Sequence, residues 1–185
     1  MLVTFRGGDT GRWRVERLTA VRGPTLRAVT RIAIFEDGGL ANKDDDAQWT
    51  LRGETSYDRY VTAPERAALS ARQAPLGRAS ARAAALIPIS KSADWWSLPQ
   101  DARRAIFEER SHHIAQSLAY LPRIARRLHH GRDLGEQFDF LTWFEFSPAD
   151  ASAFDELVGM LRATEEWGYV EREVEIRLTL AERHL

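Results

Sequence analysis

The sequence predicts a mixed α+β fold in which helices cover one face of a mainly antiparallel sheet. Residues 1–62 contain several short segments with the period-two alternation of half-buried strands. Residues 84–180 are patterned as β-α-β-β-α-β, which is the split βαβ or ferredoxin-like order. The chain has 185 residues, of which 44% are hydrophobic and 29% charged, an ordinary balance for a globular protein.

One domain is expected over residues 1–185, because the length suits a single core and no linker interrupts the pattern. The segment Pro75-Leu76-Gly77 has the composition of a turn only. We therefore expect a reduced N-terminal half, residues 1–75, to complete the sheet of a ferredoxin-like half, residues 76–185.

Four strands are expected in the first half, over residues 13–18, 32–35, 49–53 and 59–62. Glycine, aspartate and asparagine between residues 37 and 46 predict an exposed loop. An alanine-rich stretch over residues 63–74, with Pro64 near its start, predicts a helix.

The second half begins with an apolar run, residues 84–89, that predicts a buried strand. Ser97-Leu98-Pro99-Gln100 then has the form of a capping box with proline in the first turn, so a helix is expected to start there. It is expected to run to about Tyr120, because Pro122 disfavours the helical conformation at Leu121.

A hairpin is expected next, since residues 124–130 alternate, residues 131–135 supply a turn and residues 138–146 form an aromatic strand. A second helix is expected from Ser147 onwards. Its buried stripe is Phe154, Leu157, Val158 and Leu161. A last strand is expected around residues 173–180. One of its faces is Val174, Ile176, Leu178 and Leu180, and the other carries Glu173, Glu175 and Arg177.

Charge and composition exclude several classes of protein. Lysine and arginine number 26 against 27 aspartates and glutamates, and this balance argues against a dedicated nucleic-acid binder. The absence of cysteine excludes disulfides, zinc thiolate sites, iron–sulfur clusters and cysteine nucleophiles. No apolar run approaches the ~20 residues of a membrane helix, and no signal-peptide core is present, so we expect no membrane partner and a cytoplasmic location.

His113 has an unusual position on the first helix of the second half. It shares a stripe with Ile106, Ser117 and Tyr120, at the spacings of an inward helix face. An imidazole on that stripe faces the sheet, where it is either a hydrogen-bonded core residue or a ligand. His112 points about 100° away and is expected on the flank of the helix.

Arg126 stands on an apolar face of its predicted strand, together with Ile124 and Leu128, while Arg127 and His129 take the other face. An unpaired buried charge is very costly, so this guanidinium is expected to meet an anion or a cavity. Two alternatives stay open from the pattern alone. The register is shifted so that Arg127 points inward, or Arg126 belongs to a structural ion pair.

Glu166 lies at the end of the second predicted helix, within Thr164-Glu165-Glu166-Trp167. A carboxylate at this position is ordinarily solvated. It becomes functional when it accepts a hydrogen bond from the N–H of a ligand histidine, because such a carboxylate orients the imidazole and strengthens it as a donor.

Lys91 follows the predicted strand over residues 84–89 and precedes Trp95 and Trp96. This arrangement indicates either an amphipathic turn with a cation–π contact or a rim that holds a flat, acidic ligand. The pairs His112-His113 and His129-His130 suggest a polyhistidine metal site as a weaker alternative.

At these residues the sequence resembles the chlorite dismutases. The resemblance extends from about Trp49 to Leu178 and rests on four blocks that occur in order. The blocks are Ala85-Leu86-Ile87-Pro88-Ile89 with Lys91-Ser92 and Trp95-Trp96; Phe107-Glu108-Glu109 with Ser111-His112-His113; Tyr120-Leu121-Pro122 with Ile124-Ala125-Arg126-Arg127-Leu128; and Phe138-Asp139-Phe140-Leu141-Thr142-Trp143-Phe144-Glu145.

The resemblance implies a haem b protein with a dimeric α+β barrel fold, and the short chain resembles the compact, dimeric branch of the family. A homodimer is therefore expected. In this family the histidine ligand of haem stands thirteen residues before the distal arginine. His113 and Arg126 have that separation, whereas His112 would pair with Ala125.

The remaining site residues also follow from the resemblance. Glu166 matches the carboxylate that accepts the ligand imidazole's N–H. Lys91 and Tyr60 match positions on the propionate side of haem, and Trp95 or Trp96 matches a tryptophan beside the haem.

The implied activity is the decomposition of chlorite to chloride and dioxygen, with formation of an O–O bond. Arg126 would attract chlorite and retain the oxychlorine fragment. The related coprohaem decarboxylases are longer and typically lack the distal arginine. Two other functions stay open: a haem peroxidase or haem-handling protein with incidental chlorite activity, and a non-catalytic ferredoxin-like dimer that binds another flat ligand.

Overall fold

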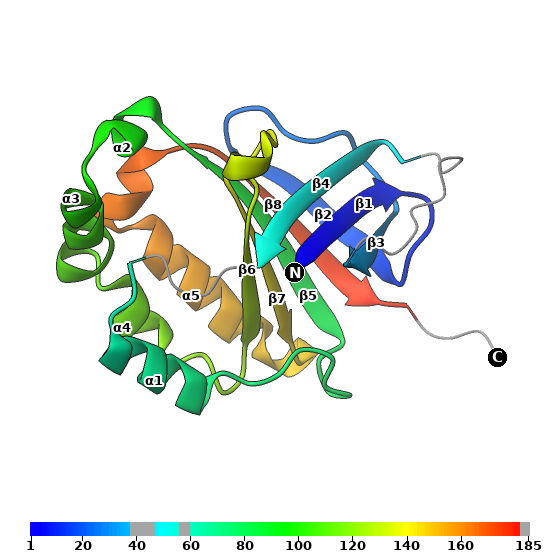
Figure 1. Ribbon diagram of the computed structural model, residues 1–185. Helices are drawn as coiled ribbons and strands as arrows, with labels where there is room; N and C mark the ends of the chain where they lie inside the picture. Colours follow the sequence, from blue (N-terminus) through cyan, green and yellow to red (C-terminus); the bar gives the residue numbers. More distant parts are fainter. Residues whose placement is uncertain (38–46, 56–59, 182–185) are drawn as a thin grey trace.

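The structure, a computed structural model, describes residues 1–37, 47–55 and 60–181. Within these ranges eight antiparallel strands close into a barrel in the order β1-β3-β2-β8-β5-β7-β6-β4 (Figure 1). The strands are β1 (Leu2–Gly8), β2 (Trp13–Arg22), β3 (Arg31–Glu36), β4 (Trp49–Thr55), β5 (Ala83–Lys91), β6 (Ala125–His130), β7 (Phe140–Phe146) and β8 (Val170–Leu180). The seam between β4 and β6 pairs Glu54 with His130 and Thr55 with His129.

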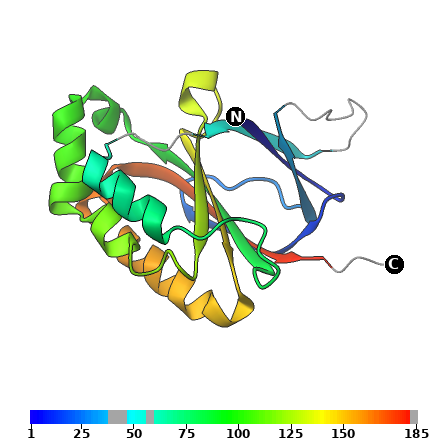
Figure 2. The same cartoon turned by 60° about the horizontal axis from the view of Figure 1, so that its bottom comes forward.

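The helices gather outside one arc of the barrel, while β1 to β4 form the opposite side (Figures 1 and 2). They are α1 (Ala63–Arg72), α2 (Ala93–Ser97), α3 (Gln100–Arg104), α4 (His113–Ser117) and α5 (Ala151–Arg162). A π-helical segment, η1 (Ala105–Arg110), joins α3 to α4, and short 3₁₀ turns lie at η2 (Arg132–Leu134), η3 (Pro148–Asp150) and η4 (Glu165–Tyr169). None of the described helices is long and apolar enough to cross a membrane.

Strand β5 is apolar from Ala83 to Ile89, and both of its faces are buried. Ala84 and Leu86 belong to the core inside the barrel. Ala85, Ile87 and Ile89 belong to a second core between the sheet and the helices. The strands β8-β5-β7-β6 therefore separate two cores. Their outer face, the one turned away from the inside of the barrel, lies towards the helices.

The predicted mixed α+β fold with an antiparallel sheet is confirmed. Seven of the predicted strands are present, most of them longer than expected, and the additional strand β1 was not predicted. The predicted helix over residues 63–74 is present as α1, which starts with a capping box between Thr62 and Glu65. The predicted loop residues 38–46 lie outside the described residues.

The prediction of a strand over residues 59–62 is wrong for the residues of this range that the structure describes. Residue 59 lies outside the described residues, and residues 60–62 form a turn that leads into α1. Tyr60 has a φ of 65°, a left-handed conformation that no strand accommodates.

The single helix expected from Ser97 to Tyr120 is also wrong. Ser97 is the last residue of α2 and forms no capping box, because its hydroxyl donates a hydrogen bond to the backbone carbonyl of Asp94. The chain instead runs through α3 and η1 to a break at His112, where φ is 50°. Local periodicity gave no sign of this break, because the inward residues on either side of it are still spaced as on a helix.

Helix α5 buries Phe154, Leu157, Val158 and Leu161 as predicted. The polar face of β8 is buried beneath it, with Glu173 1% and Glu175 3% exposed. These carboxylates are paired with arginines. Arg162 lies 2.6 Å from Glu173 and 2.7 Å from Glu175, and Arg177 lies 2.7 Å from Glu175.

Glu175→Gln is expected to lower the free energy of unfolding by about 2 kcal/mol at neutral pH, because charge-assisted bonds to three arginines, Arg17, Arg162 and Arg177, are lost. Burial alone would raise the pKa of Glu175, but hydrogen bonds and charge from Arg177 and Arg162 lower it below its usual value. The stabilisation is therefore complete above the unfolded pKa of ~4.3 and is lost as pH falls through the lower folded value.

Urea unfolding of both proteins between pH 3 and pH 8 measures this effect. The stability difference between the original chain and Glu175→Gln should shrink on acidification. A difference that is constant over the whole range would contradict an ionised, stabilising Glu175.

Candidate functional site

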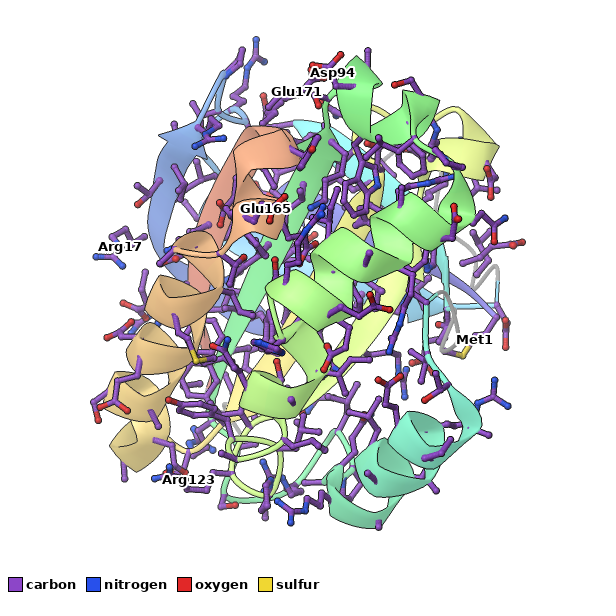
Figure 3. The ribbon with its side chains drawn as sticks, turned by 90° about the vertical axis from the view of Figure 1, so that its left-hand side faces the viewer. Met1, Arg17, Asp94, Arg123, Glu165 and Glu171 are labelled. Carbon is purple, nitrogen blue, oxygen red and sulfur yellow. The ribbon has the colours of Figure 1, made fainter. Side chains whose placement is uncertain are left out.

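A cavity of about 500 Å³ lies between the outer face of the β8-β5-β7-β6 arc and the helices that cover it. Figure 3 looks onto this helical side, with α5 and the α3–α4 segment in front of the strands. Most of the lining is aliphatic or aromatic, with a few convergent polar groups. Its volume falls within the roughly 300–1,000 Å³ of pockets for small ligands and cofactors.

His113 begins α4 and lines the cavity. Its Nδ1 lies 2.7 Å from Oε2 of Glu166. The Phe107 ring stacks on the imidazole with a centroid separation of 4.5 Å. The Trp167 ring is also nearly parallel to the imidazole, with a centroid separation of 6.3 Å. His112, by contrast, is exposed. Of the two neighbouring histidines, the structure thus brings His113 into the site.

Glu166 is buried between Lys91 and His113. Its Oε1 lies 2.8 Å from Nζ of Lys91, and its Oε2 bonds His113. Burial would raise the pKa of Glu166, but the nearby His113 and Lys91 lower it to about 2. The carboxylate is therefore ionised at neutral pH and can only accept hydrogen bonds. It follows that Nδ1 of His113 carries the proton, and Nε2 is left with the lone pair that binds a metal.

Lys91 is engaged by Glu166 rather than free at the rim of the cavity. Its ammonium also lies 4.6 Å from the centre of the Trp95 ring, and the side chain is 4% exposed. Lys91 therefore holds Glu166 in place, and because Lys91 also lines the cavity, its contact with an acidic edge of a ligand stays a prediction. Both groups are removed from water. Deleting either Lys91 or Glu166 would therefore leave the other as a buried charge without compensation.

Arg126 enters the cavity from β6, which forms part of the sheet wall. Ile124 and Leu128 line the cavity with it, as the strand alternation predicted. Arg127 instead extends to Glu36 at 2.6 Å. No residue in the described ranges accepts a hydrogen bond from Nε of Arg126, and burial lowers the pKa of this guanidinium. A partly buried cation in an apolar wall, whose Nε has no acceptor among the described residues, is suited to an anionic ligand.

The aromatic residues differ in their positions. Trp95 is 1% exposed, lines the cavity, and has no acceptor for its indole N–H among the described residues. Trp96 lies further out, where its N–H donates to Asp139 at 3.0 Å and Arg132 covers its ring at 4.1 Å. Tyr60 lines the cavity mouth 6.2 Å from Trp95 and 5.8 Å from Phe107.

Sequence reasoning missed Asp139, Glu108 and Ser111. Asp139 accepts the backbone N–H of Lys91 at 2.7 Å and the indole N–H of Trp96, so it fixes both residues. Glu108 and Ser111 bond the backbone next to His113 and Glu166. These residues occur within the blocks that carried the resemblance, but nothing in their local pattern distinguishes them from ordinary surface residues.

The residues of the cavity fit a flat, apolar group that carries a metal ion. An imidazole with a fixed tautomer, two nearly parallel aromatic rings beside it and a guanidinium whose Nε has no acceptor in the described part of the chain line the same space. A bare metal ion is not indicated, because the described residues contain no cluster of three histidines or carboxylates that could hold one. Haem satisfies these requirements with a single protein ligand.

Comparison with known proteins identifies relatives of one kind. The model of the family described as chlorite dismutase matches residues 20–181. A dimeric chlorite dismutase from Nitrobacter winogradskyi is similar in structure, with 55% identity, a TM-score of 0.91 and coverage of 97% of this chain and 99% of that chain.

Two further relatives are more distant. A mutant chlorite dismutase from Candidatus Nitrospira defluvii has 28% identity and a TM-score of 0.59 over 71% of this chain and 54% of that chain. The curated chlorite dismutase of Ideonella dechloratans is 35% identical over 88 residues, 48% of this chain. That match spans only 29% of the Ideonella protein.

Proposed function

This chain belongs to the chlorite dismutase family, and we propose that it is a haem b enzyme that converts chlorite to chloride and dioxygen. One observation carries the proposal: His113, oriented by an ionised Glu166, lines the same apolar cavity as Arg126, whose Nε has no acceptor among the described residues. In this arrangement His113 would hold the haem iron, and Arg126 would bind a small anion.

In this proposal, Nε2 of His113 holds the haem iron, and aromatic and aliphatic side chains enclose the macrocycle. Bound haem supplies the redox chemistry by which an O–Cl bond of chlorite is broken. Glu166 accepts the Nδ1 proton of His113 and keeps the imidazole electron-rich, which tunes the iron. Lys91 keeps Glu166 ionised and in place.

Arg126 remains charged at any working pH and attracts chlorite into an otherwise apolar cavity. Its N–H groups also stabilise the oxychlorine fragment after O–Cl cleavage and retain it in the cavity. The two oxygen atoms of one chlorite then combine, so ClO₂⁻ yields Cl⁻ and O₂ without any other reactant. Retention matters because escaping hypochlorite would oxidise tryptophan and tyrosine side chains in the cavity wall.

An oxygen electrode tests the proposal directly. The purified chain loaded with haemin should release one O₂ per chlorite, and ¹⁸O-labelled chlorite in ordinary water should give doubly labelled O₂. Haemin without protein is the control. A protein that consumes hydrogen peroxide with an organic donor and releases no O₂ from chlorite would be a peroxidase instead. A purified protein that is colourless and does not bind added haemin would instead be a binding protein for some other ligand.

The assembly and the internal organisation are also proposed. We infer a homodimer, supported by the similarity to a dimeric chlorite dismutase. We further infer that residues 76–185 form a ferredoxin-like half and residues 1–75 a reduced half within one domain. The strand order β8-β5-β7-β6 and the separate grouping of β1 to β4 support this division. Light scattering of the purified chain should give twice the mass of 21.0 kDa.

A further inference from the structure

The segment that leads into His113 contains two buried polar side chains to which the proposed function assigns no role. They are Glu108, which is 8% exposed, and Ser111, which is 2% exposed. Glu108 belongs to the π-helical segment η1, a type of segment that is rare and often found at functional sites. A buried carboxylate is costly unless its oxygens are bonded, so its partners are informative.

Both oxygens of Glu108 bond the start of α4. Oε2 accepts the backbone N–H of Ile114 at 2.6 Å, and Oε1 accepts that of Ala115 at 3.1 Å. These amides need an outside acceptor because the left-handed residue His112 interrupts the preceding helix. Glu108 therefore fixes the backbone on which the His113 side chain stands.

Ser111 fixes the other partner of the same hydrogen bond. Its hydroxyl oxygen accepts the backbone N–H of Glu166 at 3.0 Å. The carboxylate of Glu166 in turn accepts from Nδ1 of His113 at 2.7 Å. One short segment, residues 108–111, thus holds both ends of the His113–Glu166 hydrogen bond.

From this juxtaposition we propose that Glu108 and Ser111 are positioning residues that set the geometry of the His113–Glu166 hydrogen bond. Through that bond they set how strongly the imidazole donates electrons to the iron of bound haem. The second part rests on the proposed function. The first part concerns the protein alone and can be tested without haem.

The variants Glu108→Gln and Ser111→Ala test the proposal, with Glu109→Gln as the matched control. Glutamine keeps the shape of Glu108 but turns an NH₂ group towards one of the two amides. Glu109 is an exposed neighbour in the same segment. Ser111→Thr keeps the hydroxyl acceptor and should behave like the original chain.

The first measurement is ¹H–¹⁵N NMR of His113 in the haem-free chain. The original protein, the control and Ser111→Thr should share one far-downfield Nδ1–H resonance. Glu108→Gln and Ser111→Ala should shift it upfield, because the hydrogen bond to Glu166 lengthens. An unchanged resonance in both variants would overturn the proposal, even if both variants unfold at a lower temperature, since the two residues would then act on stability alone.

The second measurement uses the chain loaded with haemin. Glu108→Gln and Ser111→Ala should bind haemin about tenfold more weakly, the usual scale for partners behind a metal ligand. The iron–histidine band in the resonance Raman spectrum should move to lower frequency, and the reduction potential should become more positive. A Raman band and potential identical to those of the original chain would contradict the effect on iron.

The two levels of failure are distinguishable. If the original chain does not take up haemin, the proposed function fails, while the NMR measurement still decides whether Glu108 and Ser111 position His113. Should Glu108→Gln not fold, the comparison of Ser111→Ala with Ser111→Thr decides the question by itself.

Discussion

His113→Ala should reduce the affinity for haemin by at least about 100-fold, because the iron loses its protein ligand. A haemin titration followed by the Soret band measures this affinity. The same variant leaves a space the size of an imidazole beside Phe107 and Trp167, so added imidazole should enter it and restore the band. Such rescue would show that the loss concerns the ligand and not the fold.

His112→Ala is the matched control for this experiment. His112 is exposed and has a φ of 50°, so its imidazole faces away from the cavity and alanine there should leave the affinity nearly unchanged. Some loss of stability is expected in the control, since alanine tolerates the left-handed region poorly. The opposite pattern, with haemin lost in His112→Ala and kept in His113→Ala, would move the ligand by one residue.

The sequence predicted which side chains face the cavity better than it predicted the backbone that carries them. Strand alternation placed Arg126 on the same face as Ile124 and Leu128, because the period of a strand is enforced residue by residue. It also assigned Arg127 to another direction, where the structure shows its ion pair with Glu36. For His113, the stripe of inward residues gave the correct side of the chain despite an incorrect helix.

The break at His112 could not be predicted, because it depends on local bonds from a side chain to the backbone that hydrophobic periodicity does not record. The carboxylate of Glu108 replaces helical acceptors for two amides of α4, and no propensity scale contains that compensation. The ion pair between Lys91 and Glu166 could not be predicted from local patterns either. Lys91 and Glu166 are 75 residues apart, and they meet only when η4 packs against the end of β5.

Arg126→Ala is the second change with a large expected effect. Haemin affinity should be nearly retained, because Arg126 lines the cavity from the sheet and His113 from α4. kcat/KM for chlorite should fall by roughly 10²–10³-fold, the scale for removal of one donor that stabilises a developing anion. Stopped-flow spectroscopy for haem and an oxygen electrode for turnover separate the two effects.

The same variant should release more hypochlorite per chlorite consumed, because no cation retains the oxychlorine fragment. Free methionine traps hypochlorite as methionine sulfoxide, which mass spectrometry quantifies. Arg127→Ala removes an equal charge whose guanidinium is already paired with Glu36, and Arg126→Lys keeps the charge without the planar fork. Suppose that Arg127→Ala and Arg126→Ala lowered turnover equally and released equal amounts of hypochlorite. The overall positive charge near the cavity would then be sufficient to explain chlorite turnover. Arg126 would then have no specific role in holding chlorite.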